Sequence, residues 1–342
     1  RLDIAVFAHN EEGQISALIS DLSQQDILAD ENYDLRILIL ANGCSDNTVA
    51  TTRQAVDRSH PALAQRVSIF DLEKGGKSRT GHQFIHELSR QDAGFLGFMD
   101  ADIRLPNHDT LRRMMETLNG RHELQVFTSR PVKDVHYNRL KTGIIGRLIA
   151  AGGGGLTDWR KSICGQLFIV QAGAIRRVGL PAGLPVEDGF FRAMLLTNLL
   201  SQPEDLSLID GDPEIFHIYE SITSLGELIQ HQTRIVMGSA VNAALFQKIR
   251  RDAPTEPQAH ELLMAAAQND AWLGNTIRAE LPHKPYGYVP HKFMTNRWHR
   301  YRTGAKRGIK NTLIMLLGSA FDALIWLNAT RKMRKGAGAG HW

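Results

Sequence analysis

The sequence predicts an α/β fold, with a mostly parallel sheet, helices on both of its faces and a C-terminal helical extension. Short apolar runs alternate with longer amphipathic stretches through the first half of the chain. That alternation is typical of a parallel sheet covered on both faces. Beyond residue 250 the pattern becomes helical. We therefore expect a main domain over residues 1–250, divided at residue 130, and an extension over residues 251–342.

Each expected element of the first half follows from one of these runs. Strands are expected at Ile4–Ala8, Leu35–Ala41, Val67–Leu72 and Phe95–Asp100. Amphipathic periodicity predicts helices beginning near Ile15, over Asn47–Arg58 and over Lys77–Ser89.

The second half is expected to be less regular. Glycines 152–155 form a loop candidate after a helix around Leu140–Ala151. The elements expected after this loop are a strand within Cys164–Gln171, helices from Ala172 and Glu187, strands at Leu206–Ile209 and Glu214–Tyr219, and a long helix over Ser224–Arg251.

Composition is that of a globular protein, since 43% of the 342 residues are hydrophobic and 22% are charged. The two cysteines, Cys44 and Cys164, are far apart and form no CxxC pair, so neither a disulfide framework nor a structural zinc site is expected. The first residues show a strand pattern rather than that of a signal peptide. These features predict a cytoplasmic protein.

Basic residues are concentrated near the C-terminus. Seven lysines and arginines and no acid lie between Lys292 and Lys310, which suits an anionic surface. Residues 311–330 are largely apolar, with Asn311, Thr312, Ser319 and Asp322 within about a quarter of the helical wheel at about 100° per residue. We expect residues 292–335 to contact a membrane surface. Packing of 311–330 on the domain instead stays open.

Two acidic pairs are candidates for chemistry. Asp100 and Asp102 follow an expected buried strand, and their carboxylates suit a divalent cation that neutralises charge on a diphosphate. Glu187 and Asp188 open an expected helix. An acid there is favoured by the helix dipole and can equally act as a general base toward a hydroxyl. Local sequence leaves both roles open.

A lysine-containing glycine loop lies at Glu73–Ser78. A Walker motif requires glycine where Asp71 stands, so a P-loop ATPase is excluded. No GxGxxG follows the first strand, which removes the usual support for dinucleotide binding. Lys77 remains a candidate phosphate contact.

From Ile4 to about Gly238 the motifs resemble, in their order, those of the family 2 glycosyltransferases, which have the GT-A fold. The similar segments are VFAHNEE, ANGCSDNT, EKGGKSRTGHQFI, FMDADI, ICGQLFIVQAGAIRRVGLP, VEDGF and HQTRIVMG. Ala41-Asn42 replace a common aspartate pair. His231 and Ile235 replace the glutamine and tryptophan of processive members, so processive synthesis is not implied.

The resemblance implies an inverting glycosyltransferase that moves a sugar from a nucleotide-diphosphate sugar, with a UDP-sugar favoured, to an acceptor hydroxyl. It implies Mg²⁺ or Mn²⁺ on Asp102 and Asp100, with Asp188 as base and Glu187 beside it. Residues 1–130 would bind the nucleotide, residues 131–250 the acceptor, and the 152–155 loop would close over the donor. The implied donor contacts are Asn10, Glu11, Asn42, Lys77, Asp100 and Arg234.

The basic extension adds an expectation about the acceptor and the location. We expect a lipid or lipid-linked glycan, in envelope polysaccharide or glycolipid synthesis, at the cytoplasmic face of a membrane.

Three alternative functions match parts of the sequence. A nucleotidyltransferase with the same sheet would carry a Gly- and Arg-rich loop after the first strand, which AHNEEGQ lacks. A nucleic-acid-binding module would use the basic segment with Trp298 and Tyr301; nothing else supports it, so no nucleic-acid partner is expected. Intact Asp100, Asp102 and Asp188 argue against an inactive sugar-nucleotide binder.

Overall fold

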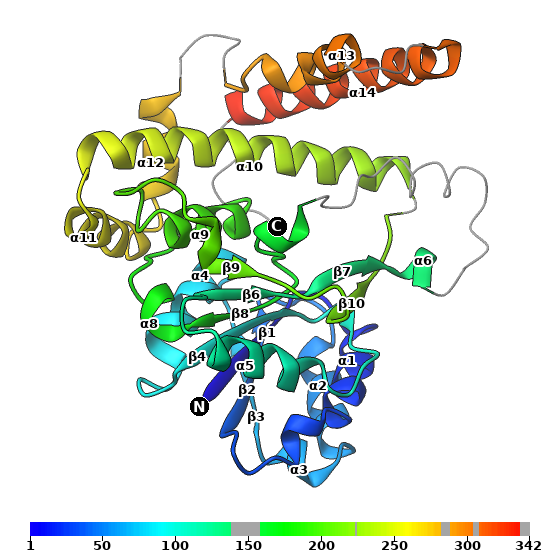
Figure 1. Ribbon diagram of the computed structural model, residues 1–342, viewed down its shortest axis with the longest axis vertical. Coiled ribbons are helices and arrows are strands. Elements are labelled where there is room, and N and C mark those ends of the chain that lie inside the picture. The colour runs from blue at the N-terminus through cyan, green and yellow to red at the C-terminus, as the bar shows by residue number, and fades with distance from the viewer. Residues whose placement is uncertain (138–157, 223, 282–287, 304–307, 336–342) are drawn as a thin grey trace.

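The centre of the molecule is a seven-stranded sheet of order β3-β2-β1-β4-β8-β6-β9. The computed structural model describes residues 1–137, 158–222, 224–281, 288–303 and 308–335 (Figure 1). The strands of this sheet are β1 (Leu2–Ala8), β2 (Leu35–Asn42), β3 (Val67–Leu72), β4 (Phe95–Asp100), β6 (Val126–Thr128), β8 (Leu167–Gln171) and β9 (Ile209–Asp210). The expected loop at residues 152–155 and the helix before it lie outside the described residues.

Strands β1 to β4 are parallel, as expected, and β8 is not. β1 pairs in parallel with β2 and with β4, and β2 pairs in parallel with β3. β8 runs antiparallel to β4 and β6. Phe7 lies opposite Asp100 in the register, so the loops after β1 and β4 open at the same edge of the sheet. The predicted mostly parallel α/β fold is confirmed.

Helices cover both faces of the sheet, because side chains along each strand alternate between two hydrophobic cores. In β1, Ala5 and Phe7 belong to one core, whereas Ile4 and Val6 belong to the other. The helices that pack on the Ile4 side include α1 (Ile15–Ser23) and α5 (Thr110–Gly120). The Phe7 side is covered by α8 (Ala172–Ile175), α9 (Glu187–Leu196) and the π-helical turn Phe84–Leu88 that continues α4 (Lys77–Gln83).

A smaller sheet of order β5-β10-β7 lies beside the first. Its strands are β5 (Ile103–Arg104), β7 (Arg130–Lys133) and β10 (Phe216–Tyr219). β5 begins directly after Asp102, so this sheet fixes the far side of the Asp100–Asp102 turn. The remaining short helices of this half are α2 (Thr48–Asp57), α3 (Pro61–Ala64) and α6 (Asp134–Tyr137).

The prediction of a strand over Leu206–Ile209 is wrong for most of its length. Residues 206–208 form a 3₁₀ turn, and only Ile209–Asp210 pair as β9. The carboxylate of Asp205 accepts hydrogen bonds from the backbone N–H and hydroxyl of Ser207, at 2.9 and 2.6 Å. This local bond competes with an extended conformation and turns the chain.

The C-terminal part forms an outer helical layer. α10 (Leu225–Asp252) crosses the domain, and the helix pair α13 (Lys292–Thr303) and α14 (Ile309–Arg334) lies beyond it (Figure 1). α11 (Glu256–Ala267) and α12 (Trp272–Glu280) connect them. Leu263, Leu273 and Ala329 belong to the same core as Phe7, so the extension is packed into the main body. A boundary at residue 250 stays a prediction.

Candidate active site

The loops that follow β1 and β2 are joined to each other by hydrogen bonds. Asn10 has a φ of 58°, in the left-handed region that asparagine tolerates better than most residues. In this conformation its Oδ1 accepts the backbone N–H of Ser45 at 2.8 Å. The backbone N–H of Glu11 donates to Thr48 Oγ1 at 2.7 Å. Both loops are thereby held at one edge of the sheet.

The loop after β3 approaches the same edge through two glycines. A Cβ on Gly43, which has a φ of 61°, would lie 2.8 Å from the backbone of Gly75. Only glycine permits both the conformation and this approach. The contact carries the Gly75–Lys77 segment over the ends of β1 and β2.

Lys77 lies at the point where the acidic residues meet. Its Nζ is 2.5 Å from Asp100 Oδ1 and 3.2 Å from Glu187 Oε1, and it donates to the carbonyl of Gly165 at 3.3 Å. Burial alone would lower the pKa of Lys77, but the carboxylates of Asp100 and Glu187 outweigh burial and raise it. The lysine is therefore a fixed cation between the two predicted acidic motifs.

Asp188 lies next to Lys77 against the backbone of Gly165. A Cβ at Gly165 would come within 3.2 Å of Asp188 Cβ, so any other residue would crowd this carboxylate. Its Oδ1 accepts the N–H of Gly189 at 2.6 Å. Burial, followed by the charge of Glu187, raises the pKa of Asp188 to about 6. A carboxylate of that pKa is ionised at neutral pH and more basic than an exposed aspartate.

Three acids gather where β1 and β4 end. Burial, together with the charges of Asp102 and Asp100, raises the pKa of Glu11 to about 7. Burial also raises the pKa of Asp100 to about 6, although Lys77 opposes the shift. Asp102 Oδ1 is buried and has no hydrogen-bond partner in the described part of the chain. A buried carboxylate oxygen of this kind calls for a cation.

Groups of three or more His, Cys, Asp or Glu side chains arranged to hold a metal ion are absent from the described residues. Asp100 and Asp102 would thus supply only part of a coordination shell. This agrees with Mg²⁺ and related ions, which commonly keep one or two carboxylates and complete the shell with water and phosphate oxygens.

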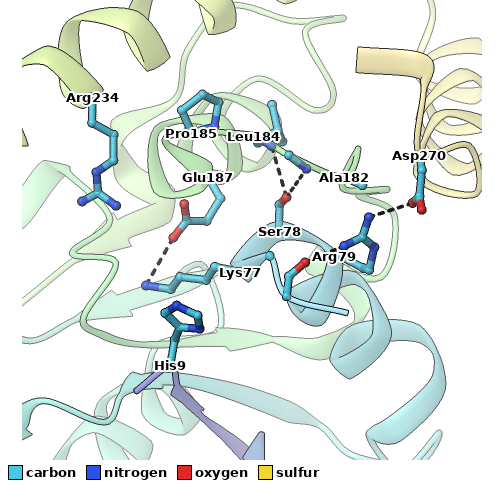
Figure 2. Close-up of a pocket in the computed structure, with 13 residues that line it drawn as sticks. His9, Lys77, Ser78, Arg79, Ala182, Leu184, Pro185, Glu187, Arg234 and Asp270 are labelled. Atoms are coloured by element: carbon cyan, nitrogen blue, oxygen red, sulfur yellow. Dashed lines mark hydrogen bonds and ion pairs between the residues drawn. The ribbon is translucent and has the colours of Figure 1, made fainter. Parts of the chain in front are cut away.

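A cavity of about 580 Å³ opens beside Lys77. Figure 2 shows Glu187 and Arg234 facing Lys77 across it, with His9 below. Arg234 comes from α10, which packs closely because Gly238 meets Val186: a Cβ at Gly238 would lie 2.2 Å from the valine side chain. The cavity is therefore lined by His9 from the loop after β1, Lys77 from α4 and Arg234 from α10, together with Glu187.

The structure brings most predicted site residues together, and Asn42 is the exception. Asn42 is fully buried, and its Oδ1 accepts the hydroxyl of Thr80 at 2.9 Å. Its carbonyl bonds to His9 Nδ1 at 2.7 Å. Asn42 thus holds His9 and Thr80 in place beside the cavity. A direct contact between Asn42 and the sugar-nucleotide donor stays a prediction.

Several residues of the cavity wall were not singled out in the sequence. Ser78 Oγ accepts the backbone N–H groups of Gly183 and Leu184, at 2.9 and 3.2 Å. Arg79 pairs with Asp270 at 3.0 Å, which brings the loop before α12 to the cavity (Figure 2). No local pattern marks Asp270, because its partner lies almost two hundred residues away in the sequence.

A buried histidine holds the segment that precedes β8. His217 is 0% exposed, and its Nδ1 lies 3.0 Å from Ser129 Oγ and its Nε2 3.2 Å from Gln166 Oε1. Burial lowers the pKa of His217 to about 3, so the ring is neutral. The carbonyl of Gln166 in turn accepts the backbone N–H of Asp100 at 2.9 Å. This chain of bonds fixes the Gly165 segment between the two acidic motifs.

Comparison with known proteins identifies the family. The family model for Glycosyl transferase family 2 matches residues 3–177, just over half of the chain. No curated protein sequence matches significantly.

Two solved structures that match this chain are the following. The mannosyltransferase PcManGT from Pyrobaculum calidifontis, in complex with GDP-Man and Mn²⁺, has a TM-score of 0.55 at 14% identity, over 98% of this chain and 87% of that one. The glucosyl-3-phosphoglycerate synthase from Mycobacterium tuberculosis has a TM-score of 0.48 at 16% identity, over 72% and 79%. The likeness to PcManGT extends through the C-terminal helices and concerns the fold alone. Together with the family match, it makes this chain a glycosyltransferase of family 2 with the GT-A fold.

Proposed function

We propose that the cavity beside Lys77 binds a nucleotide-diphosphate sugar and that the enzyme transfers the sugar, with inversion, to an acceptor hydroxyl. The observation that carries the proposal is that Lys77 is paired with both Asp100 and Glu187, beside Asp188, at the carboxyl edge of the sheet. In open α/β sheets, ligands bind outside this edge.

In the proposed reaction, the acceptor oxygen attacks the anomeric carbon while Asp188 takes the hydroxyl proton. The new C–O bond forms as the bond to the diphosphate oxygen breaks, so a single displacement inverts the carbon and releases the nucleoside diphosphate. The raised pKa of Asp188, about 6, matches the carboxylate to this task. Glu187 helps keep it there by its charge.

The departing diphosphate gains negative charge, and two cationic side chains face the place where that happens. We assign Lys77 and Arg234 to this role, because both line the cavity together with Glu187. Lys77 would exchange part of its contact with Asp100 for a phosphate oxygen. Fixed charges of this kind stabilise a leaving group without reorganisation.

Asp102 and Asp100 are the residues that would hold Mg²⁺ or Mn²⁺. The unpartnered Asp102 Oδ1 and the raised pKa values of Asp100 and Glu11 all fit a cation at this point. A divalent ion supplies Lewis-acid stabilisation of the diphosphate when it is bound. PcManGT was solved with Mn²⁺ and GDP-Man, which makes GDP-mannose a donor to test beside UDP-sugars.

For the acceptor we propose a lipid or lipid-linked glycan, with the enzyme peripheral at the cytoplasmic face of a membrane. The support is the basic outer layer of α13 and α14, whose surface is described below. Loops after β1 and β2, with Asn10 and Glu11, are assigned to the nucleoside side of the site.

The test is donor hydrolysis by the purified protein across a panel of UDP- and GDP-sugars, with Mn²⁺, Mg²⁺ or chelator. We expect metal-dependent release of nucleoside diphosphate from one donor, and its loss in Asp102→Ala. Asp109→Ala is the matched control, because Asp109 lies before α5, away from the cavity. Equal release with chelator, or an unaffected Asp102→Ala variant, would overturn the proposed donor site.

A further inference from the structure

The outer face of α14 is an exposed apolar stripe. Six of the ten large hydrophobic residues that are exposed in the described chain lie on this helix. They are Leu313, Ile314, Leu316, Leu317, Leu324 and Leu327, with exposures of 42–66%. Asn311–Arg334 is long and apolar enough to be a candidate membrane span by length and composition alone. Only 17% of its most apolar stretch is buried in the protein.

The stripe follows helical periodicity. Leu313, Leu317, Ala320, Leu324 and Leu327 are spaced by three or four residues and are all exposed, so they share one face. Exposed hydrophobic residues are ordinary when scattered singly, whereas a contiguous apolar face marks an interaction site. We name these five residues, with Leu316, the leucine stripe.

Two polar residues of α14, Thr312 and Asp322, face the neighbouring helix α13, whereas a surface helix usually turns its polar side to solvent. Asp322 accepts two hydrogen bonds from Arg297 of α13, at 2.8 and 3.1 Å. Thr312 Oγ1 lies 2.6 Å from the hydroxyl of Tyr301. α13 therefore covers the polar side of α14 and leaves the leucine stripe outward.

The C-terminal half of α14 is anchored to the domain. Ala329 and Met333 are 0% and 3% exposed, and Trp326 Nε1 donates to the carbonyl of Val289 at 3.0 Å. The stripe is thus presented by a helix whose opposite side is fixed.

The charge of the segment around the leucine stripe indicates what kind of surface binds there. Residues 292–335 contain eleven lysines and arginines and one acid, Asp322, and that acid is paired with Arg297. The first 291 residues carry the other 29 basic and 35 acidic residues and are net negative, so the net positive charge of the chain comes from the segment that bears the stripe. A second copy would bring two such positive layers together, whereas an anionic lipid surface complements both the charge and the leucines.

We infer that α13 and α14 form a membrane-binding surface, with α14 in the plane of an anionic leaflet and the leucine stripe inserted among the lipids. A transmembrane position is disfavoured, because it would break the Arg297–Asp322 pair and place Asp322 in hydrocarbon. The inference does not depend on the proposed donor site, since lipid binding is measured without turnover.

The experiment is flotation of the purified chain with vesicles of phosphatidylcholine alone or mixed with phosphatidylglycerol, at low and high salt. We expect flotation with the anionic vesicles and release by high salt. Replacing Leu313, Leu317 and Leu324 with glutamine should lower partitioning at least about tenfold. Replacing Arg331, Lys332, Arg334 and Lys335 with glutamine should lower it by about 100-fold or more.

Leu225→Gln is the matched control, because Leu225 is 56% exposed at the start of α10, outside this layer; it should float like the wild type. Equal melting temperatures exclude unfolding of the leucine variant, whose changes are at exposed positions.

Three results would overturn the inference. The first is unchanged flotation of the leucine variant, and the second is retention on vesicles after alkaline and high-salt washing, which is the behaviour of a membrane-spanning helix. The third is no flotation at all. In the last case, a dimer dissolved by the leucine changes would assign the stripe to a second copy, and salt-dependent RNA binding would assign the charge to nucleic acid.

Discussion

The edge of the sheet around Lys77 and the outer layer of α13 and α14 depart from ordinary burial in opposite ways. At the sheet edge, charged side chains are drawn inward and shift one another's pKa values. On α14, leucines are turned outward while Asp322 and Thr312 are covered. Burying charge and exposing leucine both cost stability. Each departure points to a different kind of ligand: a cation with its anionic diphosphate at the sheet edge, and an apolar surface at α14.

The largest effect is expected from Asp188→Asn, which removes the proposed base at the sheet edge. Transfer should fall by about 10²–10⁴-fold, with nucleotide binding retained. In the wild type, kcat/KM should fall as pH drops below about 6, because the protonated carboxyl cannot accept the acceptor's proton. Steady-state kinetics across pH measure both. Asp205→Asn, at the turn before β9, is the control; comparable activity in Asp188→Asn would remove the base from the mechanism.

Lys77→Met should destabilise the fold and weaken donor binding together. It leaves Asp100 and Glu187 without the cation between them, a loss of about 3 kcal/mol in the free energy of unfolding. Lys74→Met, an exposed lysine of the same loop, should change little. Denaturant unfolding at pH 5 and pH 8 is the measurement. The loss should be smaller at pH 5, where Asp100 is largely protonated, and a pH-independent loss would contradict the charge-based explanation.

Glu11→Gln should instead stabilise the metal-free protein at high pH. The folded-state pKa of Glu11 is about 7, above its ordinary value of 4.5. The folded chain therefore binds more protons than the unfolded chain between these values, and stability falls as pH rises through this window. We expect a higher melting temperature for the variant at pH 8 and no difference at pH 4.

The neighbouring change Glu12→Gln provides a contrast of sign. The carboxylate of Glu12 accepts the backbone N–H of Asn47 at 2.9 Å. Glutamine would keep a neutral acceptor in place of a charged one, so this hydrogen bond should weaken and the melting temperature at pH 8 should fall slightly. If the melting temperatures of the two variants shifted by the same amount and in the same direction at pH 8, the burial of ionised Glu11 would not be what lowers the stability of the folded protein.

The smallest stability effect is expected on the outer layer. Leu317 is 66% exposed, so Leu317→Gln should change the free energy of unfolding by no more than about 0.5 kcal/mol. Chemical denaturation with and without anionic vesicles is the measurement. A large loss without lipid would show that the stripe packs against the protein, and the contrast between the two regions would then fail.

Sequence patterns predict the sheet well where burial is uniform. The runs that became β1, β2 and β4 are largely buried, so their positions and the polar loops after them could be read directly. The antiparallel direction of β8 could not, because an apolar run has no direction. The 3₁₀ turn at residues 206–208 depends on one side chain, Asp205, which the apolar pattern does not weigh.

The same limit holds at the site. Asp100, Asp102, Glu187 and Asp188 are recognisable by position after a strand or before a helix. Asp270 and His217 act through partners distant in sequence, Arg79 and Gln166, and only the fold brings those pairs together. For α14, the sequence shows a polar quarter of the helix, but only the fold shows that α13 contacts Asp322 and Thr312 within it.

The most direct test of the sheet edge as a nucleotide-sugar site is calorimetric titration of UDP and GDP into the protein, with Mn²⁺ and with chelator, beside Asp102→Asn. We expect one nucleotide to bind only in the presence of metal, and we expect the variant to lose that binding, because Asp102 Oδ1 has no other partner among the described residues. Failure of both nucleotides to bind with metal, or undiminished binding by the variant, would contradict the assignment of Asp100, Asp102 and Lys77 to the donor.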